Sequence, residues 1–245
     1  MTSYKRVLLK LSGQVLAGDQ SIGLDFKAVR SICEEIAEVS RAGIEIAMVV
    51  GGGNILRGKE AAEQGIERSQ ADYMGMLTTV INALSLQDTL EKLGVPTRVQ
   101  TAVEMRQIAE PFIRRRALRH IEKGRIVIFA AGTGSPYFST DTAAALRSAE
   151  ISAGCLLKAT KVDGIYNKDP LINDDAKRLG RITYMDALKS QLNVMDAAAF
   201  SLCMENNIPI VVLNILKKGN LARFLLEGKD VGTIVTNDKE ESINA

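Results

Sequence analysis

Four segments of the chain place glycine, hydroxyl or basic residues directly after apolar runs. They are Lys10-Leu11-Ser12-Gly13, Gly51-Gly52-Gly53-Asn54 with Arg57 close behind, GTGSPYFSTD at 132–141, and Lys158-Ala159-Thr160-Lys161. Glycines let backbone N–H groups approach an anion closely, and lysines add the positive charge that backbone amides lack. A single glycine triplet would be weak evidence, because glycine often marks an ordinary tight turn. Together the segments predict a polyphosphate site assembled from several loops.

The fingerprints of several common sites are missing from the sequence. Neither G-x-x-x-x-G-K-[ST] nor, after the first apolar run, G-x-G-x-x-G occurs, which argues against a P-loop and a dinucleotide-binding turn. The only histidine, His120, argues against a Ser-His-Asp triad and a histidine-rich metal site. Cys33, Cys155 and Cys203 form no CxxC pattern and are expected to be buried, reduced thiols, as in a cytoplasmic protein.

Apolar runs alternate with longer segments of helical periodicity, and these elements must position the four segments. The runs are rich in Val and Ile, which is typical of strands covered on both faces in a parallel sheet. Strands are predicted at 6–11, 44–50, 96–100, 125–131, 154–159, 208–214 and 232–237, and helices at 25–42, 72–93, 112–123, 140–150, 196–207 and 219–228. The alternation predicts an α/β fold, a three-layer αβα sandwich with a mostly parallel central sheet. Ligands bind such a sheet at the carboxyl ends of its strands, where the four segments lie.

Three features of the predicted helices have ordinary structural interpretations. The apolar stripe of 72–93 is expected to face the core and consists of Met74, Leu77, Val80, Ile81, Leu84 and Leu90. The basic cluster near the predicted helix 112–123 is expected to form a solvated face and consists of Arg114, Arg115, Arg116 and Arg119. Asp141 and Asp196 each begin a helical run, so each is a candidate N-cap.

Length and composition set broader limits on the function. The chain has 245 residues, 46% of them hydrophobic and 24% charged, which is typical of a soluble globular protein. A net charge of +2 implies no global attraction to nucleic acid. The N-terminus lacks the features of a signal peptide, and no apolar run approaches the ~20 residues of a membrane span. We therefore expect one cytoplasmic domain over 1–245, with a functional loop or seam at about 160–183 and a solvated tail at 238–245.

The same segments carry a resemblance to a known family. KLSG, VVGGGNxxRG, GTGxPxxxTD and KATKVDGIY resemble the bacterial uridylate kinases (UMP kinases), a branch of the amino acid kinase family. DYMGMLTTV at 72–80 and VMDAAAF at 194–200 are similar to segments particular to that branch, and the resemblance runs from Lys5 to about Asn237. It implies the amino acid kinase fold, with an acceptor-side lobe at about 1–157 and an ATP-side lobe at about 158–237. It also implies transfer of the γ-phosphoryl group of ATP to UMP with Mg²⁺, which gives UDP and ADP in pyrimidine nucleotide biosynthesis.

The resemblance implies roles for the residues that match the family's motifs. Lys10 would neutralise charge on the phosphoryl group in transfer, and Asp141 would orient this lysine. Asp196 would lie near the phosphates and contact them by way of magnesium. ATP would be bound by Lys10, Leu11, Ser12, Gly13, Gly53, Arg57, Thr160, Tyr166 and Asp169. UMP would be bound by Gly52, Asp72, Thr133, Gly134, Ser135, Pro136, Tyr137, Phe138, Ser139 and Thr140. Lys158 is a candidate second phosphate lysine, and no residue is assigned as a metal ligand.

The chain departs from the family's pattern at two positions, and the family's regulation implies further partners. Gln14 stands where Glu is usual, which removes a carboxylate near the ATP phosphates, and Ser135 stands where Asn is frequent. Many members are hexamers that GTP activates and UTP inhibits, so a homohexamer with these effectors is implied here. Arg98 and Arg125 match arginines linked to the GTP site, although arginines near strands more often form surface ion pairs.

Two other functions fit part of the pattern. A kinase of the same fold that acts on a carboxylate or carbamate would need a different acceptor site, and Asp72 and the segment 133–140 argue against it. A non-catalytic nucleotide-sensing module would be expected to lack Lys10 or Asp141, and both are present. Neither nucleic acid nor a membrane is an expected partner.

Overall fold

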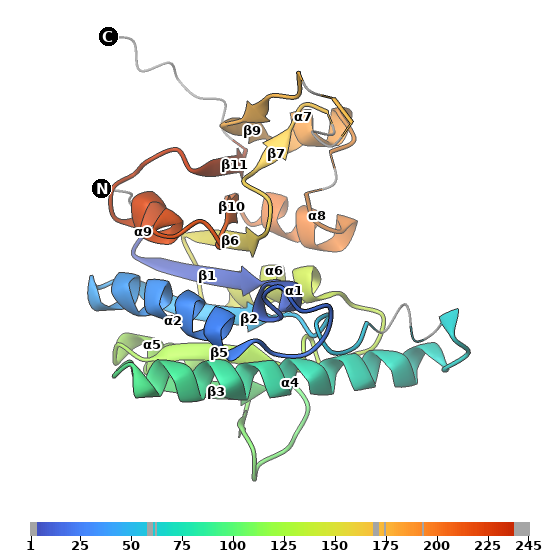
Figure 1. Ribbon diagram of the computed structural model, residues 1–245, viewed down its shortest axis with the longest axis vertical. Coiled ribbons are helices and arrows are strands. Elements are labelled where there is room, and N and C mark those ends of the chain that lie inside the picture. Colours follow the sequence, from blue (N-terminus) through green and yellow to red (C-terminus); the bar gives the residue numbers. More distant parts are fainter. Residues whose placement is uncertain are drawn as a thin grey trace.

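The computed structural model describes residues 4–57, 61, 63–168, 172–173, 175–192 and 194–237. Among these residues, nine strands form one sheet in the order β4-β3-β5-β2-β1-β6-β10-β11-β9 (Figure 1). The strands are β1 Arg6–Leu11, β2 Glu45–Val50, β3 Thr97–Thr101, β4 Glu110–Pro111, β5 Ile126–Ala130, β6 Cys155–Thr160, β9 Arg181–Thr183, β10 Ile210–Asn214 and β11 Gly232–Thr236. Neighbouring strands of this sheet are parallel except for β10 and β11. The predicted α/β class and the mostly parallel sheet are confirmed.

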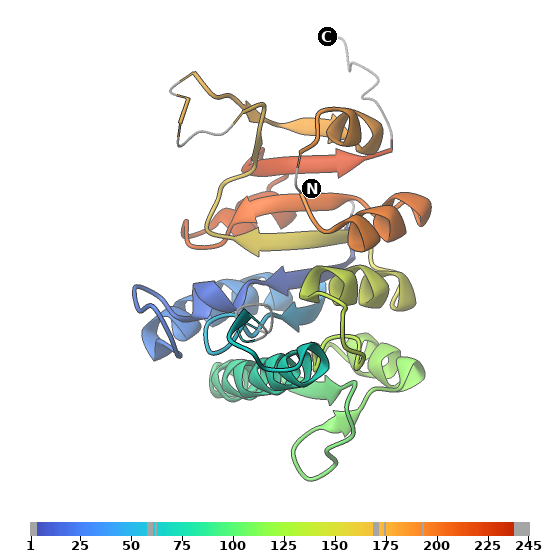
Figure 2. The same cartoon turned by 90° about the vertical axis from the view of Figure 1, so that its right-hand side faces the viewer.

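Helices cover both faces of the sheet and complete three layers (Figure 2). One face carries α1 Gly13–Leu16, α2 Phe26–Arg41, α4 Arg68–Lys92 and α9 Asn220–Leu225. The other face carries α5 Arg114–Glu122, α6 Thr140–Glu150, α7 Tyr184–Lys189 and α8 Ala197–Glu205. The predicted loop region at 160–183 contains a short antiparallel hairpin of β7 Ile165–Tyr166 and β8 Arg178–Leu179.

The central strand β1 shows why this sequence forms a two-sided sheet. Val7, Leu9 and Leu11 are buried in the core under α2 and α4, whereas Leu8 is buried in the core under α6 and α8. Side chains alternate between the two faces of a strand, so a continuous apolar run satisfies both cores. Lys10 shares the face of Leu8, and its position at the carboxyl end of β1 carries it toward the N-terminal turn of α6.

Helix α4 differs from its prediction in where it begins and in which face it buries. It begins at Arg68, after Glu67, whose side chain accepts from the backbone N–H of Ser69 at 3.0 Å. Val80 and Leu90 of the predicted stripe are buried and Leu84 is half-buried, but Met74, Leu77 and Ile81 are 40%, 52% and 49% exposed. The prediction that the whole stripe faces the core is therefore wrong. The reason is that polar side chains take inward positions on this helix, among them Thr78, Thr79 and Asn82.

Other expectations about the surface and the core are confirmed. The four arginines of the basic cluster on α5 are exposed, and the three cysteines are buried and form no disulfide. Burial raises the pKa of the Cys33 thiol to about 12, as expected for a thiol in an apolar core. In the part of the chain that the structure describes, no helix combines the length and apolar character needed to span a membrane.

Candidate active site

The lysines of the first and last of the four segments lie next to each other in the sheet. Lys10 on β1 is in register with Lys158 on the parallel strand β6. Lys10 Nζ lies 2.8 Å from Asp141 Oδ1, and Lys158 Nζ lies 2.9 Å from Asp141 Oδ2. Lys158 Nζ also donates to the backbone carbonyl of Val194 at 2.5 Å. One carboxylate from the first turn of α6 is thus held between two ammonium groups at the carboxyl edge of the sheet.

The electrostatics of this lysine pair favour an anion. The side chains of Lys10, Lys158 and Asp141 are only 11%, 21% and 15% exposed. Burial alone would raise the pKa of Asp141, but the charges and hydrogen bonds of Lys10 and Lys158 outweigh it and hold that pKa below the ordinary value of 3.8. Asp141 is therefore ionised at neutral pH and neutralises only one of the two ammonium charges.

Two helix N-termini meet beside the lysine pair. Ser139 is the N-cap of α6, and its hydroxyl accepts from the backbone N–H of Thr142 at 3.0 Å. Asp196 is the N-cap of α8 and accepts from the backbone N–H of Ala199 at 2.9 Å, so this candidate cap is confirmed. The carboxylate of Asp196 also accepts from the hydroxyls of Ser139 and Thr142, which ties the two N-termini together. Asp141 lies inside the first turn of α6, and its interpretation as an N-cap is wrong.

The first two segments pack so closely that only glycine fits at their contact. A Cβ on Gly13 would lie 2.6 Å from Asn54 Oδ1 and 2.7 Å from the carbonyl oxygen of Gly51. A Cβ on Gly52 would lie 1.8 Å from Thr78 Oγ1. The backbone N–H of Gly51 donates to the carbonyl of Leu11 at 2.9 Å, so the two segments are also joined by a hydrogen bond. Leu11 itself is fully buried and lines neither of the two cavities described below.

One cavity, of about 350 Å³, lies on the side of the sheet where α4 begins. Among the residues predicted for UMP, it is lined by Gly52, Asp72, Thr133, Tyr137, Phe138, Ser139 and Thr140, and Gly53 and Arg57 also reach it. Asp72 Oδ2 accepts from the backbone N–H of Tyr137 at 2.8 Å and from Arg68 Nε at 2.9 Å. The structure therefore brings together the start of α4 and the segment 132–141, which are far apart in the sequence.

Three residues predicted for UMP lie outside this cavity, and several lining residues, Arg68 among them, were not predicted. Gly134, Ser135 and Pro136 are not among its walls; a Cβ on Gly134 would lie 3.0 Å from the carbonyl oxygen of Ala102. Arg68 lines the cavity, and its guanidinium lies 5.6 Å from the ring centre of Tyr137. Its position four residues before Asp72 on a helix was the signal that could have identified it.

A second cavity, of about 750 Å³, lies beyond β6 and opens between the β6–β7 loop and β10. The predicted residues Thr160, Tyr166 and Lys158 line it, and Asp169 lies outside the described residues. Its other polar walls carry no role predicted from the sequence, and they include Asp163, Asn214 and Lys217. Lys158 thus belongs both to this cavity and to the lysine pair.

The side chains of this second cavity are linked by exposed hydrogen bonds and ion pairs. Tyr166 Oη donates to Asp163 Oδ1 at 2.7 Å, and Lys217 Nζ donates to Asp163 Oδ2 at 3.0 Å. The hydrogen bond from Tyr166 is the largest effect on the pKa of Asp163, which is lowered although burial opposes it. Asn214 Nδ2 donates to the carbonyl of Lys161 at 2.8 Å and so joins β10 to the end of β6.

Arg98 and Arg125 are not brought to either cavity. Arg98 is near the amino end of β3, where it is paired with Glu91 at 3.0 Å. Arg125 directly precedes β5, and its Nη1 lies 3.1 Å from His120 Nδ1. Both residues are therefore at the edge of the sheet opposite the lysine pair.

A magnesium ion fits this site only as an ion that arrives with a nucleotide. Among the described residues, no group of three or more His, Cys, Asp or Glu side chains could hold a metal. The Asp141 carboxylate is engaged by two lysines, and that of Asp196 by helix caps. Mg²⁺ commonly binds through one or two carboxylates together with substrate phosphates and water, so the available donor set suits a metal carried by phosphates.

Comparison with known proteins places this arrangement in a family. The model of the amino acid kinase family matches residues 5–214. The crystal structure of a UMP kinase from Bacillus anthracis is similar with a TM-score of 0.93 and 39% identity, covering 97% of this chain and 98% of that one. The crystal structure of a UMP kinase from Ureaplasma parvum gives 0.89 and 39%, covering 96% and 100%. On this evidence, and on a composite loop site at the carboxyl edge of its sheet, the chain belongs to the amino acid kinase family.

Proposed function

We propose that this protein is an ATP-dependent kinase that transfers the γ-phosphoryl group of ATP to UMP, giving UDP and ADP in pyrimidine nucleotide biosynthesis. The observation that carries the proposal is the Lys10–Asp141–Lys158 cluster. Its Lys158 lines the cavity beyond β6, and Thr140, which precedes Asp141, lines the cavity beside α4. Support also comes from two proteins named UMP kinase that share 39% of their residues with this chain over nearly its full length.

The proposed division of labour follows the two cavities. UMP occupies the 350 Å³ cavity of the acceptor side, about 1–157, and ATP occupies the 750 Å³ cavity of the ATP side, about 158–237. Phosphoryl transfer requires mainly that the two nucleotides be held in line and that charge on the transferred group be neutralised. The attacking group is a phosphate oxygen, which is largely ionised at neutral pH, so the step requires no general base.

Lys10 is proposed to neutralise the transferred phosphoryl group. It is the lysine of the first strand, and the backbone of Ser12 and Gly13 that follows it would contact the ATP phosphates together with Gly53 and Arg57. Asp141 holds the Lys10 ammonium in place, and Lys158 supplies a second positive charge from the ATP side. Asp196 acts on the phosphates indirectly, because its carboxylate fixes the N-termini of α6 and α8, whose dipoles favour anions.

Recognition of the two nucleosides falls to separate residues. A carboxylate accepts hydrogen bonds from a diol, so we assign the UMP ribose to Asp72. Gly52 and the segment 133–140 would enclose the rest of UMP, with Tyr137 and Phe138 67% and 56% exposed and free to contact a base. On the ATP side, Thr160, Tyr166 and Asp169 would contact the adenine and ribose.

Magnesium is proposed to enter with ATP. When bound, it would neutralise charge on the β- and γ-phosphates. Asp196, the N-cap of α8, would meet it through water, and Gln14, an exposed residue of α1, offers no charge in place of the family's usual glutamate.

A homohexamer and nucleotide effectors complete the proposal. The exposed apolar residues of α4, namely Tyr73, Met74, Leu77 and Ile81, support association with further copies of the chain. Arg98 and Arg125 are proposed to contribute to a GTP site remote from the lysine pair, with UTP as an inhibitor. Three buried thiols without a disulfide support a cytoplasmic location. Sedimentation of the purified protein would test the hexamer.

The alternative acceptors, a carboxylate or a carbamate, are less well supported by the acceptor cavity. Its walls include the acidic side chain of Asp72. The charge of this side chain would repel a small carboxylate, whereas it would accept hydrogen bonds from the hydroxyl groups of a ribose. A coupled ADP-release assay with UMP, CMP, dTMP, carbamate, acetylglutamate and aspartate tests the proposal. We expect turnover with UMP well above that with any other acceptor, and a protein inactive with UMP would overturn the assignment.

A further inference from the structure

Helix α4 buries polar side chains that the proposed reaction does not use. Thr78, Thr79 and Asn82 are 6%, 5% and 0% exposed, and Asn54 opposite them is 1% exposed. A helix face that packs on a sheet is normally apolar, and buried polar groups persist where hydrogen bonds satisfy them. These side chains are therefore expected to hold neighbouring backbone segments in place through hydrogen bonds.

The amides of Asn54 and Asn82 use all of their N–H groups on each other and on two loops. Asn82 Nδ2 donates to the carbonyl of Gly51 and to Asn54 Oδ1, each at 2.7 Å. Asn54 Nδ2 donates to Asn82 Oδ1 at 3.0 Å and to the carbonyl of Gly23 at 2.8 Å. The reciprocal pair therefore fixes the glycine loop, Gly51–Gly53, against α4 and against the connection between α1 and α2.

The same helix also contacts the backbone carbonyls of Gly51 and Gly52, which precede the N–H groups of Gly52 and Gly53. Asn82 donates to the carbonyl of Gly51. Thr78 Oγ1 shares its one hydrogen between the carbonyls of Gly75, at 2.7 Å, and Gly52, at 3.2 Å, and the Gly52 carbonyl also accepts from the backbone N–H groups of Ile55 and Leu56. In a trans peptide the C=O of one residue and the N–H of the next point in opposite directions. The N–H groups of Gly52 and Gly53 are consequently directed away from α4.

The nitrogen of Gly53 adjoins the first segment, whose backbone is proposed to contact the ATP phosphates. A Cβ on Gly13, in the first segment, would lie 2.9 Å from the nitrogen of Gly53. Within the described part of the chain, neither the N–H of Gly52 nor that of Gly53 donates a hydrogen bond. Gly52 and Gly53 also line the acceptor cavity. Two unpaired N–H groups that face an anion site can stabilise charge that develops during transfer.

Thr79 connects α4 in the same way to the segment 132–141, here called the acceptor loop. Its hydroxyl accepts from the backbone N–H of Ala131 at 2.8 Å and donates to the carbonyl of Met76 at 2.6 Å. Ala131 has a φ of 60°, so a non-glycine residue is held in the left-handed region where the acceptor loop begins. One face of α4 thus binds both loops between which the phosphoryl group would pass.

We propose that Asn82 is a positioning residue for phosphoryl transfer. Its bond to the Gly51 carbonyl orients the Gly52 N–H group toward the transferred phosphoryl group, and its pairing with Asn54 holds the loop that carries the Gly53 N–H group. This inference rests on the proposed kinase function. A merely structural Asn82 would affect folding and leave the turnover of folded protein unchanged. A positioning Asn82 affects turnover more than the binding of either nucleotide.

The test compares Asn82→Asp with Gln87→Glu, which makes the same chemical change on the same helix. Gln87 Nε2 donates to the carbonyl of Thr97 at 3.2 Å, on β3 and outside the glycine loop. Asn82→Asp removes the donor to Gly51, and we expect kcat to fall about 100-fold, the usual loss for a misplaced oxyanion donor, with KM for ATP and UMP within about threefold. Gln87→Glu should keep kcat within about threefold of wild type, since it touches no substrate loop.

A milder variant covers the case in which Asn82→Asp does not fold. Thr78→Val removes the hydroxyl that is shared between the carbonyls of Gly75 and Gly52, and it should lower kcat about fivefold with unchanged KM values, as expected for one weak neutral bond to the glycine loop. Wild-type protein without UMP kinase activity would overturn the proposed function itself. With an active wild type, a folded Asn82→Asp at the kcat of Gln87→Glu would overturn only the positioning role. Where Asn82→Asp does not fold, Thr78→Val at that kcat would do the same.

Discussion

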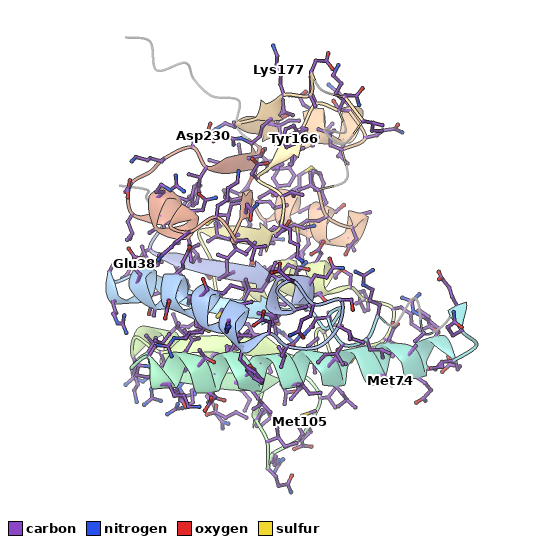
Figure 3. All side chains as sticks on the ribbon, in the orientation of Figure 1. Glu38, Met74, Met105, Tyr166, Lys177 and Asp230 are labelled. Atoms are coloured by element: carbon purple, nitrogen blue, oxygen red, sulfur yellow. The ribbon has the colours of Figure 1, made fainter. Side chains whose placement is uncertain are left out.

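The acceptor side and the ATP side of the lysine pair are held together in different ways. On the acceptor side, Asn54, Thr79 and Asn82 are buried, and each connects a loop to α4. On the ATP side, the side chains of Lys217 and Asp163 are 57% and 33% exposed, and their ion pair borders an open cavity. Figure 3 shows Tyr166 of the ATP side in the upper half of the view and Met74, on α4 of the acceptor side, in the lower half.

The difference has an energetic consequence. An exposed ion pair contributes about 0–1 kcal/mol, whereas breaking a buried hydrogen bond leaves an unsatisfied group at a cost of about 1–3 kcal/mol. The acceptor loops are thus more rigidly positioned than the walls of the ATP cavity. Such an arrangement suits a kinase that must select one acceptor, because preorganised polar groups discriminate strongly between similar substrates. Substitutions at the junction and on each side test this comparison.

The largest effect is expected at the lysine pair, where the acceptor side and the ATP side meet, and within this pair at Lys10. Lys10→Ala removes the charge proposed to stabilise the transferred group, and kcat should fall about 1,000-fold, within the range of other preorganised electrostatic groups. UMP affinity should stay within about twofold by calorimetry, because no UMP contact is assigned to Lys10. A collapse of UMP affinity with turnover preserved would show that Lys10 binds the acceptor instead.

A smaller effect is expected from Asp141, which orients Lys10 without touching substrate. Asp141→Asn should lower kcat about 10- to 100-fold, because two neighbouring ammonium groups lose their common counter-charge. The pH dependence of unfolding gives a second readout. The pKa of Asp141 is lowered in the folded protein, so its ion pairs stabilise the fold above the ordinary value of 3.8 and are lost as the pH falls through the lowered pKa.

Urea unfolding between pH 7 and pH 3 would measure this contribution. Wild type should lose the Asp141 contribution only at the acidic end of this range, and Asp141→Asn should lack that part of the loss. Equal acid sensitivity of the two proteins would mean that the ion pairs do not stabilise the folded state.

Sequence patterns predicted the fold and the position of the site for physical reasons that can be named. Apolar runs such as RVLLKL indicate strands covered on both faces, and parallel strands present their carboxyl ends at one edge. That rule was sufficient to place Lys10 and Lys158 at the same edge. It could not predict that one carboxylate lies between them, because the α6 register relative to β1 and β6 is a matter of tertiary packing.

The prediction that the apolar stripe of α4 faces the core was wrong for an equally specific reason. Hydrophobic periodicity assumes that a helix buries its apolar residues, but Asn82 and Thr79 are buried here and Leu77 and Ile81 are exposed. An asparagine becomes an inward residue only when it has partners, and those partners, Asn54 and the Gly51 carbonyl, lie about 30 residues earlier in the sequence. Arg68 was missed because the predicted helix began at residue 72, so its helical spacing from Asp72 was not recognised, and its contact with Tyr137 depends on tertiary structure.

A moderate effect, confined to the acceptor side, is expected at Asp72. Asp72→Asn replaces a charged acceptor of hydrogen bonds by a neutral one, and the KM for UMP should rise about tenfold while the KM for ATP is unchanged. Asp88→Asn is the matched control, because Asp88 lies on the same helix and pairs with Lys92 on the exposed surface. A UMP dependence equal to that of the control would remove Asp72 from the site.

The smallest effect is expected on the ATP side, at Tyr166. Tyr166→Phe removes the 2.7 Å hydrogen bond to Asp163 but leaves the ring on β7, and Asp163 keeps its ion pair with Lys217. Because these groups are partly exposed, water can replace the lost hydroxyl, and the KM for ATP should rise only about twofold. Tyr73→Phe, on the exposed face of α4, is a control for the substitution itself. If Tyr166→Phe instead raised the KM for ATP more than Asp72→Asn raises that for UMP, the ATP side would be the more rigidly organised one, and the contrast drawn between the two sides would be reversed.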